Sequence, residues 1–242
     1  MKSLFEAIGY RVGMAAAKAK NIFDLYGGDD EESRRAEIQL GRDLEAAMLM
    51  RVQLAEENPA TRFAKDIGLW LADHVREKRI PFNFRVTTEQ ELSSYALPGG
   101  PVFLSLPLLE ACRGERDEIA FIFAHEMAHI ILRHALDRIV RDSVFSLLLQ
   151  QTAGRSAASA WLGKVGQQTL SRAYSRENEL EADSFALSLI RTCGGDELAG
   201  EHLLAKLAQG LPNQSVITLG EYFATHPPLP ERIAHLQSKR LG

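Results

Sequence analysis

Hydrophobic and polar positions recur along most of this chain with the period of a helix. Residues 119–132 read IAFIFAHEMAHIIL and predict a helix that is buried on all faces. Amphipathic helices are predicted over residues 33–57 and 61–78, and further helices over 196–209 and 229–239. Another amphipathic helix is predicted near the N-terminus, with apolar positions at Leu4, Phe5, Ile8, Val12, Ala15 and Ile22.

Patterns typical of strands are confined to the middle of the chain. Residues 81–86 and 102–106 carry β-branched and aromatic side chains, and the turn sequence PGGP of residues 98–101 precedes the second run. Pro101 has no backbone donor, which suggests an edge position or the start of a strand. The expected fold class is therefore α+β, mainly α, with a small antiparallel sheet packed beside the buried helix.

Two parts of the chain are expected, because Asn58 followed by Pro59 interrupts the helical pattern. Residues 1–58 are predicted to form a helical extension that packs on the core, and residues 59–242 to form the principal domain. A chain of 242 residues that is 45% hydrophobic can bury one compact core. The first helix also carries basic residues, so peripheral contact with a membrane through this helix is an alternative to packing.

The net charge limits the classes of partner that are expected, while the cysteine content does not determine the cellular compartment. The net charge of −4 and the pI near 6.0 argue against nucleic acid as a partner. Charged residues interrupt the apolar positions after Lys2, so no signal peptide is recognised. As it stands the chain is expected to be cytoplasmic or peripherally membrane-associated, or periplasmic if a targeting segment was removed. Cys112 and Cys193 are interpreted as reduced, with a single bridge left open.

His125, Glu126 and His129 have the spacing of a zinc site on a helix. A step of four residues turns a helix by about 400°, so the two imidazoles project from one face. Glu126 lies about 100° around the helix from His125, which suits a base beside the metal. His134 is half a turn out of phase with His125 and is not expected to be a ligand.

The apolar surroundings of these side chains strengthen the prediction of a metal site. Burying unpaired polar groups costs several kcal/mol, and a bound metal removes that cost. One zinc ion per chain is therefore expected. The alternative is a pair of core histidines satisfied by hydrogen bonds, with Glu126 paired to a distant arginine.

The sequence SRENELEAD, residues 175–183, is the best source of a third ligand. Ser175 can cap a helix, and Glu179 and Asp183 then share one face with small alanines that permit close helix packing. Glu179 can reach the metal, and Asp183 can accept a hydrogen bond from a ligand imidazole. Glu177 and Glu181 are expected to point elsewhere. The alternative is an ordinary solvated helix start that is rich in acids.

The ordered motifs YALPGG, HEMAH, SRENELEAD and THPPLPERI lie within residues 93–233. With them the chain resembles the HtpX and CAAX-prenyl-protease family of gluzincin metallopeptidases, in particular its soluble or peripheral quality-control branch. The resemblance implies a zincin-like catalytic domain over residues 59–242. It also implies that His125, His129 and Glu179 bind zinc and that Glu126 is the general base.

Hydrolysis of peptide bonds in extended or unfolded protein segments, in protein quality control, is the function that this resemblance implies. Water activated by zinc would attack the peptide, and Glu126 would accept its proton. One departure concerns residues 93–95, which are Ser-Ser-Tyr where the family usually has Asn-Ala-Phe. The alternative function is a latent or non-catalytic zinc-bound chaperone or scaffold that binds unfolded chains.

His226 is a further catalytic candidate, because Pro227 restricts its backbone and stiffens the loop. It could donate to the oxyanion of the tetrahedral intermediate, or bind zinc as a fourth ligand and keep the enzyme latent. The alternative is a histidine exposed at the start of the last helix.

Overall fold

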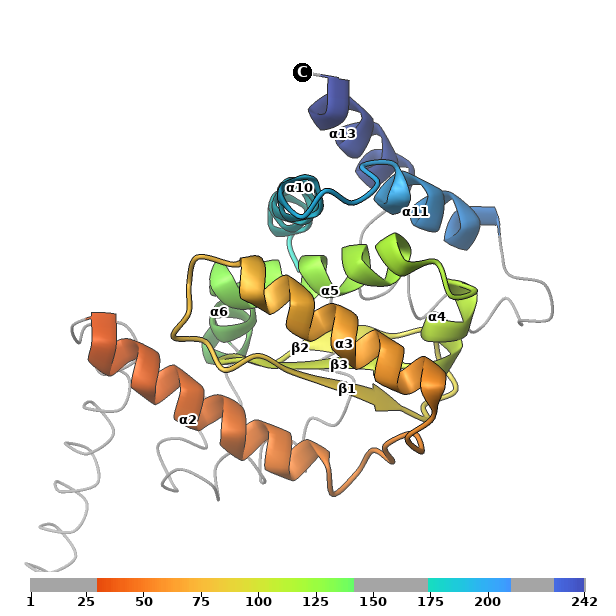
Figure 1. Cartoon of the computed structure of the whole chain (residues 1–242). Helices are drawn as coiled ribbons and strands as arrows, with labels where there is room; N and C mark the ends of the chain where they lie inside the picture. The colour runs from red at the N-terminus through yellow and green to blue at the C-terminus, as the bar shows by residue number, and fades with distance from the viewer. Residues whose placement is uncertain (1–29, 142–173, 210–228, 242) are drawn as a thin grey trace, which may run out of the picture.

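A buried helix, α5 (Arg116–Ile131), lies at the centre of the molecule. The computed structural model describes residues 30–141, 174–209 and 229–241. In Figure 1, helix α3 and the sheet lie on one side of α5, and α10, α11 and α13 lie on the other. Every side chain from Glu118 to Ile130 is buried, as the unbroken apolar run predicts.

The helices before the sheet are α2 (Asp30–Met48) and α3 (Pro59–His74). Asn58 caps α3 by accepting hydrogen bonds from the backbone of Ala60 and Thr61, and the Thr61 hydroxyl accepts one from the backbone N–H of Asn58. Proline at the first position of a helix loses no hydrogen bond. Asn58 and Pro59, which interrupt the helical pattern of the sequence, therefore begin α3.

The sheet contains β1 (Asn83–Thr87), β2 (Ser94–Ala96) and β3 (Pro101–Ser105), in the order β1-β3-β2. β3 pairs in parallel with β1 and antiparallel with β2. The fold class is confirmed, but the sheet is mixed and not purely antiparallel as expected. Pro101 begins the central strand, where its missing donor is tolerated.

The remaining described helices come before and after α5 in the sequence. α4 (Leu106–Ala111) and α6 (His134–Arg141) flank it in sequence, while α10 (Arg176–Thr192) and α11 (Ala199–Gln209) pack directly on it. The last described helix, α13 (Leu229–Leu241), packs on α10 and α11. Ala182 and Ala186 are buried on α10, and their small side chains allow the close contact with α5.

Helix α2 is shorter than the helix predicted over residues 33–57. The Ala55 backbone donates to Val86, and the Thr88 backbone donates to Gln53, so this segment extends along the free edge of β1. Pairing with a strand thus replaces the last turns of the predicted helix. Helix α3 likewise ends at His74, before the predicted residue 78.

Several predictions fall on residues outside the described ranges. The N-terminal amphipathic helix and its membrane contact belong to residues 1–29, and His226 belongs to residues 210–228. The division at residue 58 stays a prediction. Among the described helices, none is both long and apolar enough to span a bilayer.

Candidate metal centre

The two histidines of the HEMAH motif face each other on α5. Their Nε2 atoms lie 3.2 Å apart, and both rings are buried. Ile119 to Ile130 form uninterrupted helix, so residues one turn apart must present their side chains to the same side. The helical period therefore accounts for this part of the cluster.

Glu179 reaches the histidines from α10. Ser175 caps this helix by accepting a hydrogen bond from the Asn178 backbone, which fixes where the helical period begins. Glu179 Oε2 lies 3.4 Å from His125 Nε2, and Glu179 Oε1 lies 3.5 Å from His129 Nε2. The structure thus brings the three predicted ligands together, with ligand atoms all within 4.8 Å of one another.

The chemistry and spacing of these atoms fit a zinc ion. Zinc binds imidazole nitrogen and carboxylate oxygen at about 2.0–2.2 Å in tetrahedral sites. Ligand atoms on such a tetrahedron are separated by about 3.3–3.5 Å. The separations of 3.2, 3.4 and 3.5 Å among the three side chains are close to this spacing. The cluster can therefore accept the ion with little rearrangement.

Asp183 and Arg232 lie behind His125. Asp183 Oδ1 is 3.0 Å from His125 Nδ1, so this nitrogen can donate to the carboxylate and leave Nε2 free to bind metal. Arg232 donates to both oxygens of Asp183, at 2.8 and 2.6 Å, and its Nη1 lies 3.3 Å from Glu179. Burial alone would raise the pKa of Asp183, but Arg232 and His125 lower it to about 2. Asp183 is therefore a carboxylate at neutral pH.

A second set of contacts orients His129. Its Nδ1 lies 3.1 Å from Nδ1 of His134, whose Nε2 lies 3.3 Å from Glu181. His134 can accept at Nδ1 only when it is neutral, and burial lowers its pKa. The ring of Tyr174 stacks on His129 with centroids 3.7 Å apart. These contacts hold the imidazole with Nε2 toward the cluster.

Burial alone would lower the pKa of His125, and the nearby Arg232 acts in the same direction. Hydrogen bonds to Asp183 and Glu179 outweigh both effects and raise the pKa to about 9. In the metal-free protein His125 therefore holds a proton at neutral pH, which a metal ion has to displace.

Glu126 is fully buried next to the cluster, on the side of α5 that faces the sheet. Its Oε1 accepts a hydrogen bond of 2.7 Å from the Ser94 hydroxyl on β2. Its Oε2 has no hydrogen-bond partner among the described residues. A buried carboxylate oxygen without a partner is costly, which suits an atom whose partner is a reacting water.

The sequence did not assign roles to Arg232, Ser94, Tyr174 or His134. Arg232 lies in the THPPLPERI motif, and its place in that motif was the only signal for it. His134 was not expected to be a metal ligand, because on a continuous helix it would lie half a turn out of phase with His125. The structure shows that α5 ends at Ile131 and that Arg133 has a φ of 62°, which reorients the chain at this point.

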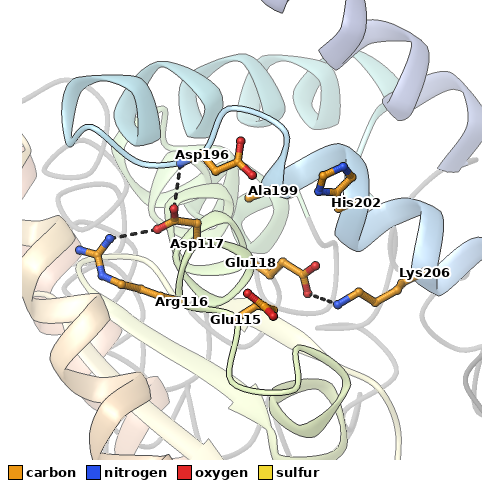
Figure 2. A pocket seen from close by; sticks show the side chains of 8 residues that line it. All are labelled: Glu115, Arg116, Asp117, Glu118, Asp196, Ala199, His202 and Lys206. Carbon is orange, nitrogen blue, oxygen red and sulfur yellow. Dashed lines mark hydrogen bonds and ion pairs between the residues drawn. The ribbon is translucent and has the colours of Figure 1, made fainter.

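A separate cavity of about 510 Å³ lies at the opposite end of α5, beside the start of α11 (Figure 2). Its charged groups largely satisfy one another: Lys206 binds Glu118 at 2.6 Å, and Asp117 accepts from Arg116 and from the Asp196 backbone. None of the predicted site residues lines it. The cavity is therefore distinct from the metal cluster.

Comparison with known proteins finds one family whose model covers the residues of the metal cluster. The model of peptidase family M48 matches residues 60–240. The β-barrel assembly-enhancing protease of Escherichia coli is 25% identical over 217 residues, which cover 84% of this chain and 43% of that protein. The mitochondrial metalloendopeptidase OMA1 of Schizosaccharomyces pombe is 27% identical over 161 residues, covering 65% and 46%.

Metalloprotease YcaL of Escherichia coli is 25% identical over 171 residues, covering 66% of this chain and 62% of its own length. The chain spans less than two thirds of the length of each of these relatives. The family match itself extends over far more than half of the chain, and it confirms the resemblance drawn from the four motifs. The chain belongs to peptidase family M48.

Proposed function

We propose that this chain is a zinc-dependent endopeptidase that hydrolyses extended or unfolded segments of proteins. The observation that carries the proposal is the convergence of His125, His129 and Glu179 beside the buried carboxylate of Glu126. A closed structural zinc site has four protein ligands and needs no free carboxylate. A hydrolytic site needs an open position and a base, and the described residues supply three ligands and the carboxylate of Glu126.

His125, His129 and Glu179 would hold the zinc ion, which would supply a Lewis acid that lowers the pKa of water and polarises the scissile carbonyl. Glu126 accepts the proton of the attacking water through Oε2 and returns it to the departing amine. Asp183 and His134 keep the ligand imidazoles in the tautomers that expose Nε2. Arg232 balances the negative charge of Asp183 and Glu179.

The position of β2 supports an extended substrate. β2 is an edge strand of the sheet and packs on α5, which carries the metal cluster. An extended peptide can add to such an edge through main-chain hydrogen bonds, which do not depend on its side chains. This mode favours unfolded segments over folded domains. Protein quality control is the proposed setting, in keeping with relatives named as an assembly-enhancing protease and as mitochondrial endopeptidases.

The test is degradation of an unfolded protein by the purified, zinc-loaded chain beside the variant Glu126→Gln. The variant retains the metal ligands but cannot accept the proton, so we expect cleavage by the parent and a loss of at least about 100-fold in kcat in the variant. Zinc content is measured for both proteins. Equal cleavage by both would contradict the role of Glu126. Tight binding of unfolded chains without cleavage would favour the zinc-bound chaperone or scaffold.

His226 is proposed to act on the same site, and its variant His226→Ala separates its two expected roles. Loss of an oxyanion donor lowers kcat by about 100-fold while the zinc affinity stays the same. Loss of a fourth zinc ligand lowers the zinc affinity and raises the activity of the resting enzyme. An unchanged zinc affinity together with unchanged kinetics would contradict both roles.

A further inference from the structure

Glu126 differs from five other buried carboxylates in the kind of partner that it has. Several buried carboxylates have an arginine or lysine nitrogen within 3.3 Å: Glu37, Glu118, Glu179, Asp183 and Glu201. Glu126 is equally buried, but among the described residues the group that hydrogen-bonds it is the neutral hydroxyl of Ser94. Within the described part of the chain, the carboxylate expected to act as the base is thus held by a neutral hydroxyl and has no cationic partner.

We propose that Ser94 is a positioning residue that fixes the carboxylate of Glu126 for proton transfer. The 2.7 Å bond from the hydroxyl engages Oε1, which leaves Oε2 as the oxygen available to the reacting proton. A hydroxyl bound to a carboxylate makes a short, strong hydrogen bond and restricts rotation about the carboxylate axis. The inference rests on the proposed function, because it assigns Ser94 a role through Glu126.

The sheet gives Ser94 a rigid position for this task. Ser94 pairs with Leu104 of β3, and alternation along β2 turns Ser94 and Ala96 inward while Tyr95 is less buried. β2 packs directly on α5. A group on a paired strand is held more precisely than one on a loop. A hydroxyl also leaves the negative charge of Glu126 available to the water and the departing amine, for which a guanidinium would compete.

The first experiment compares Ser94→Ala, Ser94→Thr and Ser93→Ala in steady-state cleavage of an unfolded protein. Ser93 is a matched control, because its hydroxyl is buried one residue away and has no hydrogen-bond partner among the described residues. We expect Ser94→Ala to lower kcat about tenfold, with KM changed less than twofold and zinc content unchanged. Ser94→Thr retains the hydroxyl and should recover most of kcat, and Ser93→Ala should match the parent.

The second experiment measures the contact itself in the zinc-free protein, independently of activity. Urea unfolding is followed for the parent, Ser94→Ala, Glu126→Met and the double variant. In the parent, Ser94→Ala leaves a buried carboxylate unsatisfied and should raise the unfolding equilibrium constant about tenfold. In the Glu126→Met background the same change should have little effect, because no charge is left unpaired.

The outcomes separate this inference from the proposed function. A parent that cleaves while Ser94→Ala has unchanged kcat, or loses activity only through KM or zinc loss, overturns the inference and leaves the function intact. Failure of Ser94→Thr to recover kcat, with normal stability, also overturns it. A parent that does not cleave overturns the function, and the unfolding cycle then decides whether Ser94 holds Glu126 at all: equal effects in both backgrounds exclude it.

Discussion

Among the residues that the structure describes, Arg232 is an arginine that pairs with both buried carboxylates of the metal cluster, Asp183 and Glu179. It is almost fully buried and binds Asp183 while lying close to Glu179. Removing it would leave two buried carboxylates, one turn apart on α10, without this cation. The pKa of Asp183 would rise, and its carboxylate would lose the two hydrogen bonds from Arg232 that hold it beside His125.

We predict that Arg232→Met lowers the zinc affinity by about 10- to 100-fold. The substitution removes the support that Arg232 gives to Asp183, which in turn orients the metal ligand His125. A competition titration with a chelator measures this change. Arg240→Met is the matched control on the same helix, since the half-buried Arg240 pairs with the buried carboxylate of Glu201, which is not part of the metal cluster. Equal zinc affinity in Arg232→Met and the parent would contradict the prediction.

The two cysteines should differ in reactivity. Both are free, in agreement with the interpretation from sequence. Burial raises the pKa of Cys112 to about 12, and the partial burial of Cys193 also raises the pKa of that thiol. Only the thiolate reacts with alkylating reagents, and a higher pKa leaves less thiolate at a given pH.

At pH 8 the folded protein is therefore expected to incorporate iodoacetamide at Cys193 much faster than at Cys112. Peptide mass spectrometry after timed labelling gives the two rates. Labelling in denaturant provides the reference, in which both sites should react alike. Similar rates in the folded protein would show that Cys112 is more accessible than its burial indicates.

The residues of the metal centre that could be predicted from the sequence are those whose spacing along a helix places them on one face. His125, His129 and Glu179 each lie on an uninterrupted helix, so spacing along the chain determines which side chains share a face. Ser94 and Arg232 join the centre from a strand and a distant helix, and no local period relates them to α5. Ser94 also lies within residues 93–95, where the chain departs from the usual family motif.

At the scale of elements, α2 packs against the turn before β3 with almost no space between the backbones. A Cβ added to Gly41 would lie 1.9 Å from the Pro98 carbonyl oxygen, which belongs to the backbone and cannot move aside easily. The adjoining Gly99 has a φ of 75° and lies against the backbone of Ile38. Glycine is required on both sides of this contact.

Gly41→Ala is therefore expected to destabilise the protein by about 1–3 kcal/mol, although helix propensity alone favours alanine by about 1 kcal/mol. Thermal or urea unfolding measures whether the free energy of unfolding falls or rises. Ala46→Gly, at an exposed position of the same helix, reports the propensity effect without the clash. An increase in stability for Gly41→Ala would mean that α2 is not held against this turn.

Short elements were the least predictable from sequence. The direction of β1 relative to β3 depends on how the chain returns between them, and five residues of strand carry no information about that path. The end of α2 was missed for a similar reason, because residues 53–55 pair with β1 instead of continuing a helix. Long helices with strong apolar patterns were placed correctly, since their own residues determine them.

At the scale of the whole molecule, the metal cluster joins α5 to α10, and Arg232 adds α13 to the same contact. A ligand that binds only the folded chain stabilises it by about 2.7 kcal/mol at a free concentration 100 times its Kd. For a domain of this size that corresponds to a rise of roughly 5–10 °C in Tm.

We predict this rise on zinc addition for the parent and for Glu126→Gln alike, because neither lacks a ligand. Differential scanning calorimetry with and without zinc measures it. Glu179→Gln, which removes the charged ligand from α10, should show a much smaller rise. An equal rise in all three proteins would indicate that zinc binds elsewhere.

The order of strands in the sheet has a consequence for the protein as it is being synthesised. β3 lies between β1 and β2 although it follows both in the chain, and β1 and β2 do not pair with each other. On the ribosome both outer strands emerge before β3, the strand that joins them, so the sheet cannot close until residue 105 has emerged. A pause in translation before residue 105 has emerged would leave the unpaired edges of β1 and β2 exposed to other nascent chains, whereas a pause just after it has emerged would allow the sheet to close before α5 emerges.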